Sequence, residues 1–368
     1  MNWFKFLTRK VSALFVFCLS INPTAVKMKK IVLLLLITSL FLGTQAQDPN
    51  FSQFFVSPLT LNPALTGKFN GTLRVAGNYR NQWPAFERAF VTSTASVDFP
   101  VLTSRLAETD TWGVGLMGMT DKTADGILTA NFLSVTTAYH KGLDEDGLHQ
   151  LGVGFQGTWG GKRLSGARLN FEDELDLQGT WTNTSDEPIN NKDVTVNYFD
   201  FSAGVLYNGS TDSYNNFYLG VSVYHINRPR ESFAGDAGVY VLNPRITANL
   251  GGSFPIGVDK NLHVTAMIST QAKALNIVFG GALAFNVNGD EVNPTNVYLG
   301  AFTRFSQLND AIIPHVGLEF GAFRLAASYD VNLSSLKVGS QRQGGIELAL
   351  IYTLFPPDGR PKIPCPKY

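Results

Sequence analysis

The chain has 368 residues, a formal net charge of zero and a hydrophobic content of 44%, which suits one large domain or two of ordinary size. Its charged residues amount to 16%, well below the roughly 25% that is usual in soluble globular proteins. That shortage argues against a surface that faces water everywhere.

The chain begins with two basic and apolar stretches. Residues 28–47 combine paired lysines, an apolar run and then small residues, the pattern of a secretory signal peptide that is cleaved after Ala46. A membrane anchor is the alternative, but a run of about a dozen apolar residues is too short for a helix across a hydrocarbon core of roughly 30 Å. The other stretch lies between Met1 and Met28, and either methionine fits the start of translation. We assign residues 1–46 to the leader and signal peptide, outside the fold.

The next segment, residues 47–71, is too rich in proline and asparagine for a strand. It nevertheless carries Phe51, Phe54, Phe55 and Leu61, which are side chains that need burial. The segment therefore depends on the rest of the chain for an apolar environment.

Short segments with a period of two recur from residue 72 to residue 355. In one of them Phe323, Leu325 and Tyr329 alternate with residues that are polar or small. Successive side chains of a strand point to opposite faces, so each of these strands has one apolar face and one polar or small face. We predict about 14 strands, near residues 72–80, 89–99, 111–120, 127–140, 148–159, 194–208, 215–226, 243–254, 261–271, 275–286, 297–304, 311–320, 322–331 and 344–355.

Strand length and aromatic placement decide the class of sheet. Many predicted strands span about 9 to 12 residues, which fits a tilted strand across a bilayer better than the 5 to 6 residues usual in soluble sheets. A soluble β-sandwich also alternates its faces and is the alternative. Aromatic girdles at the two interfaces are typical of membrane barrels, and the following residues lie near predicted strand ends: Tyr79, Trp83, Trp112, Tyr139, Trp159, Tyr207, Tyr224, Tyr329 and Tyr352. The sequence thus predicts an all-β protein of the outer membrane, a transmembrane antiparallel up-and-down β-barrel over residues 72–355, with residues 356–368 as a periplasmic tail.

The connections between the predicted strands differ in length. With an even number of strands and both ends in the periplasm, odd-to-even connections lie outside the cell and are the longer ones. The long connections are predicted at 160–193, 227–242 and 332–343, all on the outer side, and the short turns at 209–214, 255–260 and 320–321. This asymmetry supports the assigned topology.

A closed barrel offers the apolar side chains of residues 47–71 a place to be buried. We predict that this segment packs into the lumen or its periplasmic mouth, with Asn62 and Pro63 in a turn.

Inward-facing arginines allow two interpretations. Arg74, Arg80 and Arg324 either line a path for anions or pair with carboxylates such as Asp98 and Asp330. Pairing is the more frequent arrangement in a narrow lumen.

Two acidic clusters lie in predicted connections. Asp144, Glu145 and Asp146 fit either a Ca²⁺ site or a charged turn, and the missing further ligands of a calcium loop favour the turn. The acidic residues between Glu172 and Asp176 either contact a basic partner or keep the outer loop solvated, and solvation is the commoner role of a charge run.

The sequence contains no recognisable motif for catalysis or for binding a cofactor. The five histidines are isolated, and removal of Cys18 with the leader leaves Cys365 as the one cysteine, which excludes an internal disulfide and a multi-cysteine metal site. No nucleophile, phosphate-binding or dinucleotide-binding motif occurs at a strand-to-helix junction. We expect a non-enzymatic protein that binds no metal, cofactor or nucleic acid. Cys365 either forms an intermolecular bridge or packs against the base of the barrel.

Residues near the two ends of the exported chain form a signature. The first group comprises Asp48, Pro49, Phe51, Ser52, Gln53, Pro58, Leu61, Asn62, Pro63, Gly67, Tyr79, Arg80 and Trp83, and the second is the tail with Cys365 and Pro366. In these residues the chain resembles the PorP/SprF family of Bacteroidetes type IX secretion proteins, over essentially the whole exported length.

The resemblance implies an outer-membrane component of the type IX secretion system that anchors or assembles secreted proteins at the cell surface, with a link to gliding motility in some members. The implied partners are a secreted surface protein with a type IX sorting domain, other secretion-system components and the lipid bilayer. The signature residues are expected either to pack within the protein or to contact a partner. The loop at 160–193 departs from the family pattern, so the identity of the partner stays open. A channel or transporter for small or apolar solutes is the alternative, because a barrel of about 14 strands can enclose a path.

Overall fold

The computed structural model describes residues 48–86, 90–176, 178–211, 215–233, 240–257, 259–289, 295–306, 310–334 and 339–355. The predicted leader and signal peptide, and the predicted tail with Cys365 and Pro366, lie outside the described residues.

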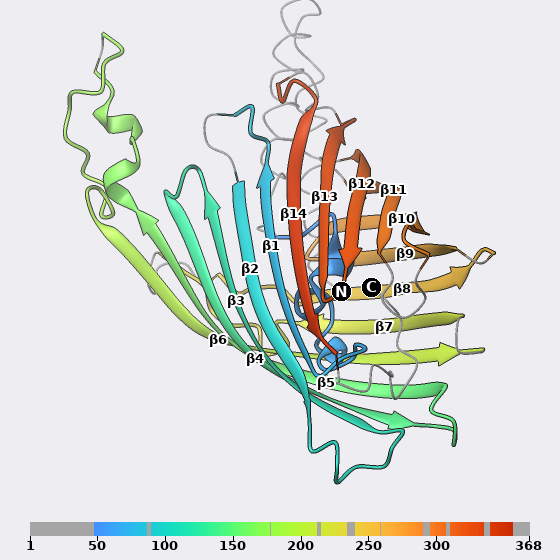
Figure 1. Ribbon diagram of the computed structural model, residues 1–368. Coiled ribbons are helices and arrows are strands. Elements are labelled where there is room, and N and C mark those ends of the chain that lie inside the picture. Colours follow the sequence, from blue (N-terminus) through green and yellow to red (C-terminus); the bar gives the residue numbers. More distant parts are fainter. Residues whose placement is uncertain are drawn as a thin grey trace, which may run out of the picture. The chain divides into compact units, whose positions relative to one another are not determined.

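Fourteen antiparallel strands close into one barrel (Figure 1). Each strand pairs with its neighbours in the sequence, and β1 pairs with β14 from Leu73↔Leu354 to Gln82↔Gly345 to close the wall. The strands are β1 (Leu73–Gln82), β2 (Phe90–Val101), β3 (Thr111–Thr123), β4 (Leu128–Gly142), β5 (His149–Ser165), β6 (Asp193–Ser210), β7 (Asn216–Tyr224), β8 (Arg245–Pro255), β9 (Lys260–Gln271), β10 (Ala274–Asn286), β11 (Asn296–Ser306), β12 (Ala311–Phe320), β13 (Phe323–Asn332) and β14 (Gln343–Leu354). The predicted up-and-down barrel and its number of strands are confirmed.

The barrel buries polar side chains and exposes apolar ones. On β13, Phe323, Leu325 and Tyr329 are 41%, 42% and 38% exposed, whereas Ser328 and Asp330 are 6% and 0% exposed. A soluble sandwich would show the reverse distribution, because its apolar faces meet in the core. The outward apolar face therefore fits contact with lipid, and the polar face lines the lumen.

The connections that follow β5, β7 and β13 share one end of the barrel, because all odd-numbered strands run in the same direction. We call this end, where the odd-numbered strands finish, the loop end, and the end where β1 begins the start end. In the predicted orientation the loop end faces outside the cell.

The largest departure from the predicted strands lies at β5 and β6. These strands pair as far as Ser165↔Asp193, so they occupy part of the loop that the sequence predicts at 160–193. Gly160 and Gly161 carry no side chain, and they interrupt the alternation on which the prediction depends. The hairpin of β5 and β6 therefore continues beyond the residues at which the alternation of apolar and polar side chains ends.

Three short helical turns precede β1, namely η1 (Phe54–Val56), α3 (Pro58–Leu61) and η2 (Pro63–Leu65). Proline begins α3 and η2, since its fixed φ suits the first helical position. The turns join an apolar cluster made of Phe54, Leu61, Ala64, Leu65, Leu206, Tyr218, Met267, Val278, Phe302, Ala311 and Ile313. An apolar core therefore lies inside the barrel and not between two sheets, and a second buried cluster is formed by Val56, Ala76, Ala326, Ala349 and Ile351.

Two further turns, η3 (Gly166–Arg168) and η4 (Glu172–Glu174), lie between β5 and β6. Within the described residues, no helix combines the length and the apolar character needed to cross a membrane.

Candidate functional site: the lumen segment

Residues 48–68, which we call the lumen segment, run through the barrel from the loop end to the start end. Asp48 contacts His225 and Gln271, which lie where β7 and β9 finish at the loop end. Lys68 donates to Gln150, which lies near the beginning of β5 at the start end. The lumen segment therefore spans the length of the lumen.

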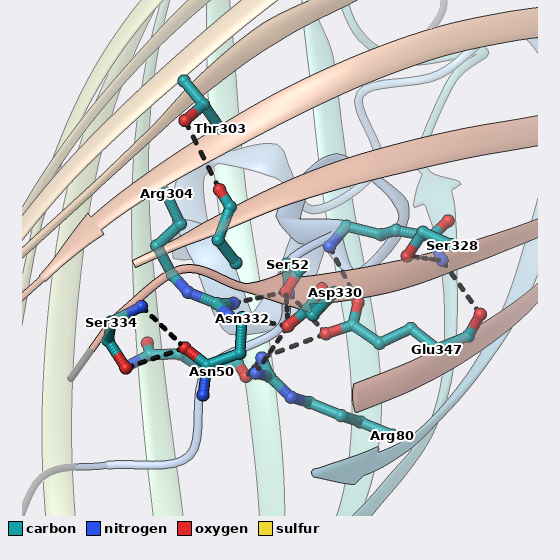
Figure 2. Close-up of polar contacts among 12 residues, drawn as sticks. Asn50, Ser52, Arg80, Thr303, Arg304, Ser328, Asp330, Asn332, Ser334 and Glu347 are labelled. Atoms are coloured by element: carbon teal, nitrogen blue, oxygen red, sulfur yellow. Dashed lines mark hydrogen bonds and ion pairs between the residues drawn. The ribbon is translucent and has the colours of Figure 1, made fainter. Parts of the chain in front are cut away.

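A group of buried charges faces the lumen segment from four strands (Figure 2). The Arg80 cluster comprises Arg80 on β1, Arg304 on β11, Asp330 on β13 and Glu347 on β14. Arg80 lies 3.2 Å from Asp330 and 3.0 Å from Glu347, and Arg304 lies 2.6 Å from Asp330. Two positive and two negative charges balance, which is what charges removed from water require.

The lumen segment supplies further partners of the Arg80 cluster. The backbone N–H groups of Ser52 and Gln53 donate to the two carboxylate oxygens of Glu347, at 2.6 and 2.8 Å. The Ser52 hydroxyl donates to Oδ2 of Asp330 at 3.0 Å. These contacts are drawn in Figure 2. Removal of the segment would leave buried carboxylate oxygens without these donors, which is costly in free energy.

Small residues on the inward face of β3 to β7 make room for the lumen segment. The small-residue row consists of directly paired positions on five neighbouring strands, Gly113, Ala138, Gly154, Gly204 and Ser222. A Cβ atom on Gly154 would lie 2.4 Å from the backbone nitrogen of Ala64, and one on Gly204 would lie 2.0 Å from Oδ1 of Asn62. Backbone of the wall and backbone of the segment can approach this closely only where glycine stands.

Asn62 fastens the lumen segment to β6 and β7. Its Oδ1 accepts a hydrogen bond from the Ala64 N–H at 2.9 Å and so caps η2. Its Nδ2 donates to the carbonyl oxygens of Val205 and Val221 at 3.2 and 3.4 Å. Asn62 and Pro63 thus form the turn that the sequence predicts, and Asn62 is fully buried in it.

An ion pair holds the lumen segment near the start end. Arg74 pairs with Asp98 at 2.8 Å, and the same carboxylate accepts from the Gly67 N–H at 2.8 Å. Arg74 also donates to the Leu65 carbonyl oxygen at 3.0 Å. Gly67 has a φ of 71°, a conformation that favours glycine.

A second ionic group holds the other end of the segment. Asp48 lies 2.7 Å from Nε2 of His225 and 3.5 Å from Nε of Arg245, and Nδ1 of His225 lies 3.1 Å from Asp200. Burial opposes a charge on His225, but Asp48 and Asp200 outweigh it and raise the pKa of His225 to about 9. Burial likewise opposes the charge on Asp48, yet Arg245 and His225 hold the pKa of Asp48 well below its usual value.

The structure divides the predicted signature residues into two groups. Within the lumen lie Asp48, Pro49, Phe51, Ser52, Gln53, Pro58, Leu61, Asn62, Pro63, Gly67 and Arg80. Tyr79 points outward and is 41% exposed, and Trp83 follows β1, where its ring contacts Phe86 and Phe90. Neither of these two residues contributes to holding the lumen segment.

The predicted pairing of inward arginines with carboxylates is confirmed for Arg74 with Asp98 and for Arg80 with Asp330. Arg324 pairs instead with Glu319, on the neighbouring strand, at 2.8 Å.

Several residues that hold the lumen segment are absent from the sequence prediction. Arg304 and Glu347 are charged residues between apolar or uncharged neighbours in a strand, and that signal could have identified them as inward-facing. His225 gives no such signal, because its carboxylate partners Asp48 and Asp200 come from distant parts of the chain.

In both acidic clusters, a carboxylate accepts hydrogen bonds from residues of its own turn or loop. The Asp144 carboxylate accepts from the backbone N–H groups of Leu148 and His149, at 3.2 and 3.0 Å. In the loop after β5, the side chain of Thr180 and further donors of the same loop lower the pKa of Asp176 to about 2. Within the part of the chain that the structure describes, no three His, Cys, Asp or Glu residues gather as a metal site.

A closed wall, an apolar outward face and an interior occupied by an N-terminal segment define an outer-membrane β-barrel. The family of type IX secretion system membrane proteins PorP/SprF matches residues 43–352, and the chain belongs to this family. It is thus an outer-membrane component of the type IX secretion system. No curated protein matches the sequence.

Solved structures of outer-membrane proteins are similar to the chain at low sequence identity. The toluene transporter TbuX of Ralstonia pickettii is 10% identical with a TM-score of 0.45, over 81% of this chain and 94% of TbuX. The translocator domain of the autotransporter NalP from Neisseria meningitidis is 12% identical with a TM-score of 0.42, over 82% and 96% of the two chains. Omp33 of Acinetobacter baumannii is 10% identical with a TM-score of 0.41, over 77% and 99%.

Proposed function

We propose that this protein is a non-enzymatic anchor that retains or assembles secreted proteins at the cell surface, and that it contributes to gliding in cells that glide. Its partner is a secreted protein with a type IX sorting domain, held together with other components of the secretion system. Family membership supplies the link to the secretion system.

The occupied lumen is the observation that favours an anchor over a channel. The lumen segment is bonded to the wall at both of its ends and at the Arg80 cluster between them. Cavities of about 50, 60 and 80 Å³ lie beside it, each lined in part by residues of the lumen segment. The segment thus occupies space inside the barrel that an open channel would leave free.

Removal of the gene is the direct test of this function. Cells that lack the protein are expected to release at least one surface protein with a type IX sorting domain into the medium, measured by quantitative mass spectrometry of medium and cell fractions. Restoration of the gene should return that protein to the cells. An unchanged distribution of all such proteins would rule out the anchoring function.

A further inference from the structure

Along part of its length, one edge of β6 has no neighbouring strand among the residues that the structure describes. β6 pairs with β5 from Ser165↔Asp193 to His149↔Gly209, but its pairing with β7 covers only Ala203 to Ser210. Residues 193–198 therefore extend beyond the end of β7. Within the described residues, no strand pairs with them on that side.

The side chain of Asn227 takes the place of a strand where β7 ends. Its Nδ2 donates to the Phe199 carbonyl oxygen at 2.7 Å, and its Oδ1 accepts from the Phe201 N–H at 3.0 Å. The backbone groups of Phe199 and Phe201 thus point toward the β7 side. Because this direction alternates along a strand, the backbone groups of Thr195 and Asn197 point to the same side.

We call the unpaired edge at residues 193–198 of β6 the open edge. It lacks the features that usually prevent a further strand from adding to a sheet. Residues 194–198 read Val-Thr-Val-Asn-Tyr, with no lysine or proline, and their register with β5 contains no bulge. β-Branched and aromatic residues favour the extended conformation. Thr195 and Asn197 are exposed residues.

The open edge lies on the loop side of the aromatic girdle. Trp159 and Phe199 are paired across β5 and β6 and are 43% and 68% exposed, as expected at a lipid interface. Beyond them the hairpin carries the exposed ion pair Arg163 with Asp193, at 3.5 Å. Figure 1 shows this hairpin continuing into the loop between β5 and β6. In the predicted orientation the edge is therefore outside the cell, in water.

We propose that an extended segment of the anchored surface protein adds to this edge as a further strand, paired with residues 193–197 of β6. This inference rests on the anchoring function proposed above. Main-chain hydrogen bonds from Thr195 and Asn197 supply the attachment, and the alternate side chains of the partner strand meet the exposed side chains of β6. The partner chemistry is that of a short β-strand without proline at the paired positions.

Proline at position 195 tests the attachment. Thr195→Pro removes an N–H that points to the open edge but no hydrogen bond to β5, because the backbone groups of Thr195 face away from β5. Thr195→Ala removes the same side chain and keeps the N–H, so it is the matched control. Each variant replaces the wild-type gene in cells, and its amount and its heat-dependent mobility in gels establish that the barrel has folded.

The readout is the surface protein that the gene deletion releases. We expect Thr195→Pro to release about a tenfold larger fraction of it than Thr195→Ala, which should match the wild type. If the deletion releases a surface protein but a folded Thr195→Pro variant retains it fully, strand addition at this edge is wrong while anchoring stands. A deletion that releases nothing overturns both.

Hydrogen exchange gives a second measurement that needs no variant. The backbone amides of Thr195 and Asn197 should exchange at least about tenfold more slowly in the protein purified together with the released surface protein than in the protein alone. Equal exchange of these two amides in both samples would contradict the proposal.

Discussion

The Arg80 cluster illustrates how single residues hold the lumen segment. Arg304→Ala removes one of the two arginines that contact Asp330 and leaves the buried negative charge poorly compensated. We expect a loss of about 3–5 kcal/mol in the free energy of unfolding, measured by denaturant titration in detergent. Arg163→Ala, at an exposed pair with Asp193, is the control and should cost less than about 1 kcal/mol. Equal effects of the two substitutions would contradict a structural role for the cluster.

Gly204 tests the contact between the small-residue row and the lumen segment. Gly204→Ala places a Cβ 2.0 Å from Oδ1 of Asn62, so the segment or the wall must move. We expect a loss of about 1–3 kcal/mol, with faster proteolysis of residues 48–68. Gly118→Ala is the matched control, because no atom lies within 4 Å of its added Cβ. Resistance to protease equal to that of the wild type in the Gly204 variant would argue against close packing.

His225 makes the attachment of Asp48 depend on pH. The pKa of His225 is raised from 6.5 to about 9, so the protonated form is favoured in the folded protein. The resulting stabilisation is fully present below about pH 6.5 and is lost as the pH rises through about 9. We expect the urea midpoint to fall over that interval, and His225→Gln to flatten the profile. A wild-type midpoint that stays constant from pH 6 to 9.5 would show that this histidine is not charged in the barrel.

At the scale of elements, the lumen segment behaves as an additional layer of the barrel. Its three helical turns supply apolar side chains to the core cluster, and each well-buried leucine or phenylalanine contributes roughly 1.5–3 kcal/mol. Deletion of residues 48–67 removes this layer together with the donors to Glu347 and Asp98. We expect a barrel with a lower unfolding temperature, or cells that no longer retain their surface protein, as judged by thermal gel-shift and by cell fractionation. An unchanged barrel with unchanged retention would refute a role for the segment.

The strands could be predicted from the sequence because alternation is a local property. Phe323, Leu325 and Tyr329 reveal one face of β13 without knowledge of any partner. The open edge of β6 could not be predicted, since it depends on where β7 ends relative to β6. The sequence predicts too short a β5, because Gly160 and Gly161 carry no side chain that would continue the alternation between apolar and polar residues.

For the lumen segment too, local features could be predicted from the sequence and features that depend on distant residues could not. Phe51 and Leu61 reveal that the segment needs burial, and the apolar character of these residues is local information. The small-residue row could not be predicted in this way. The role of Gly113, Gly154 and Gly204 in making room for the segment depends on the strand register, which places them in one row across neighbouring strands. A glycine in a strand predicts a close approach somewhere, but not what approaches.

At the scale of the whole molecule, a channel and an anchor differ in whether the lumen segment must move. A solute path requires displacement of the segment, whereas an anchor works with the segment in place. The hydroxyl oxygens of Thr66 on the segment and Thr136 on β4 lie 2.7 Å apart, so cysteines at both positions need only small shifts to form a disulfide of about 2.05 Å. In a Cys365→Ser background this bond ties the segment to β4 directly after η2.

We expect cells with the locked barrel to retain as much surface protein as cells with the wild-type barrel, and the purified locked and unlocked proteins to conduct equally little in planar bilayers. Reduction of the disulfide is the internal control, because it releases the segment without a change of sequence. Loss of function in the oxidised form, restored by reduction, would mean that the segment leaves the lumen while the protein works. Steady conductance that appears only on reduction would likewise assign the barrel to transport, because reduction frees the segment from the wall.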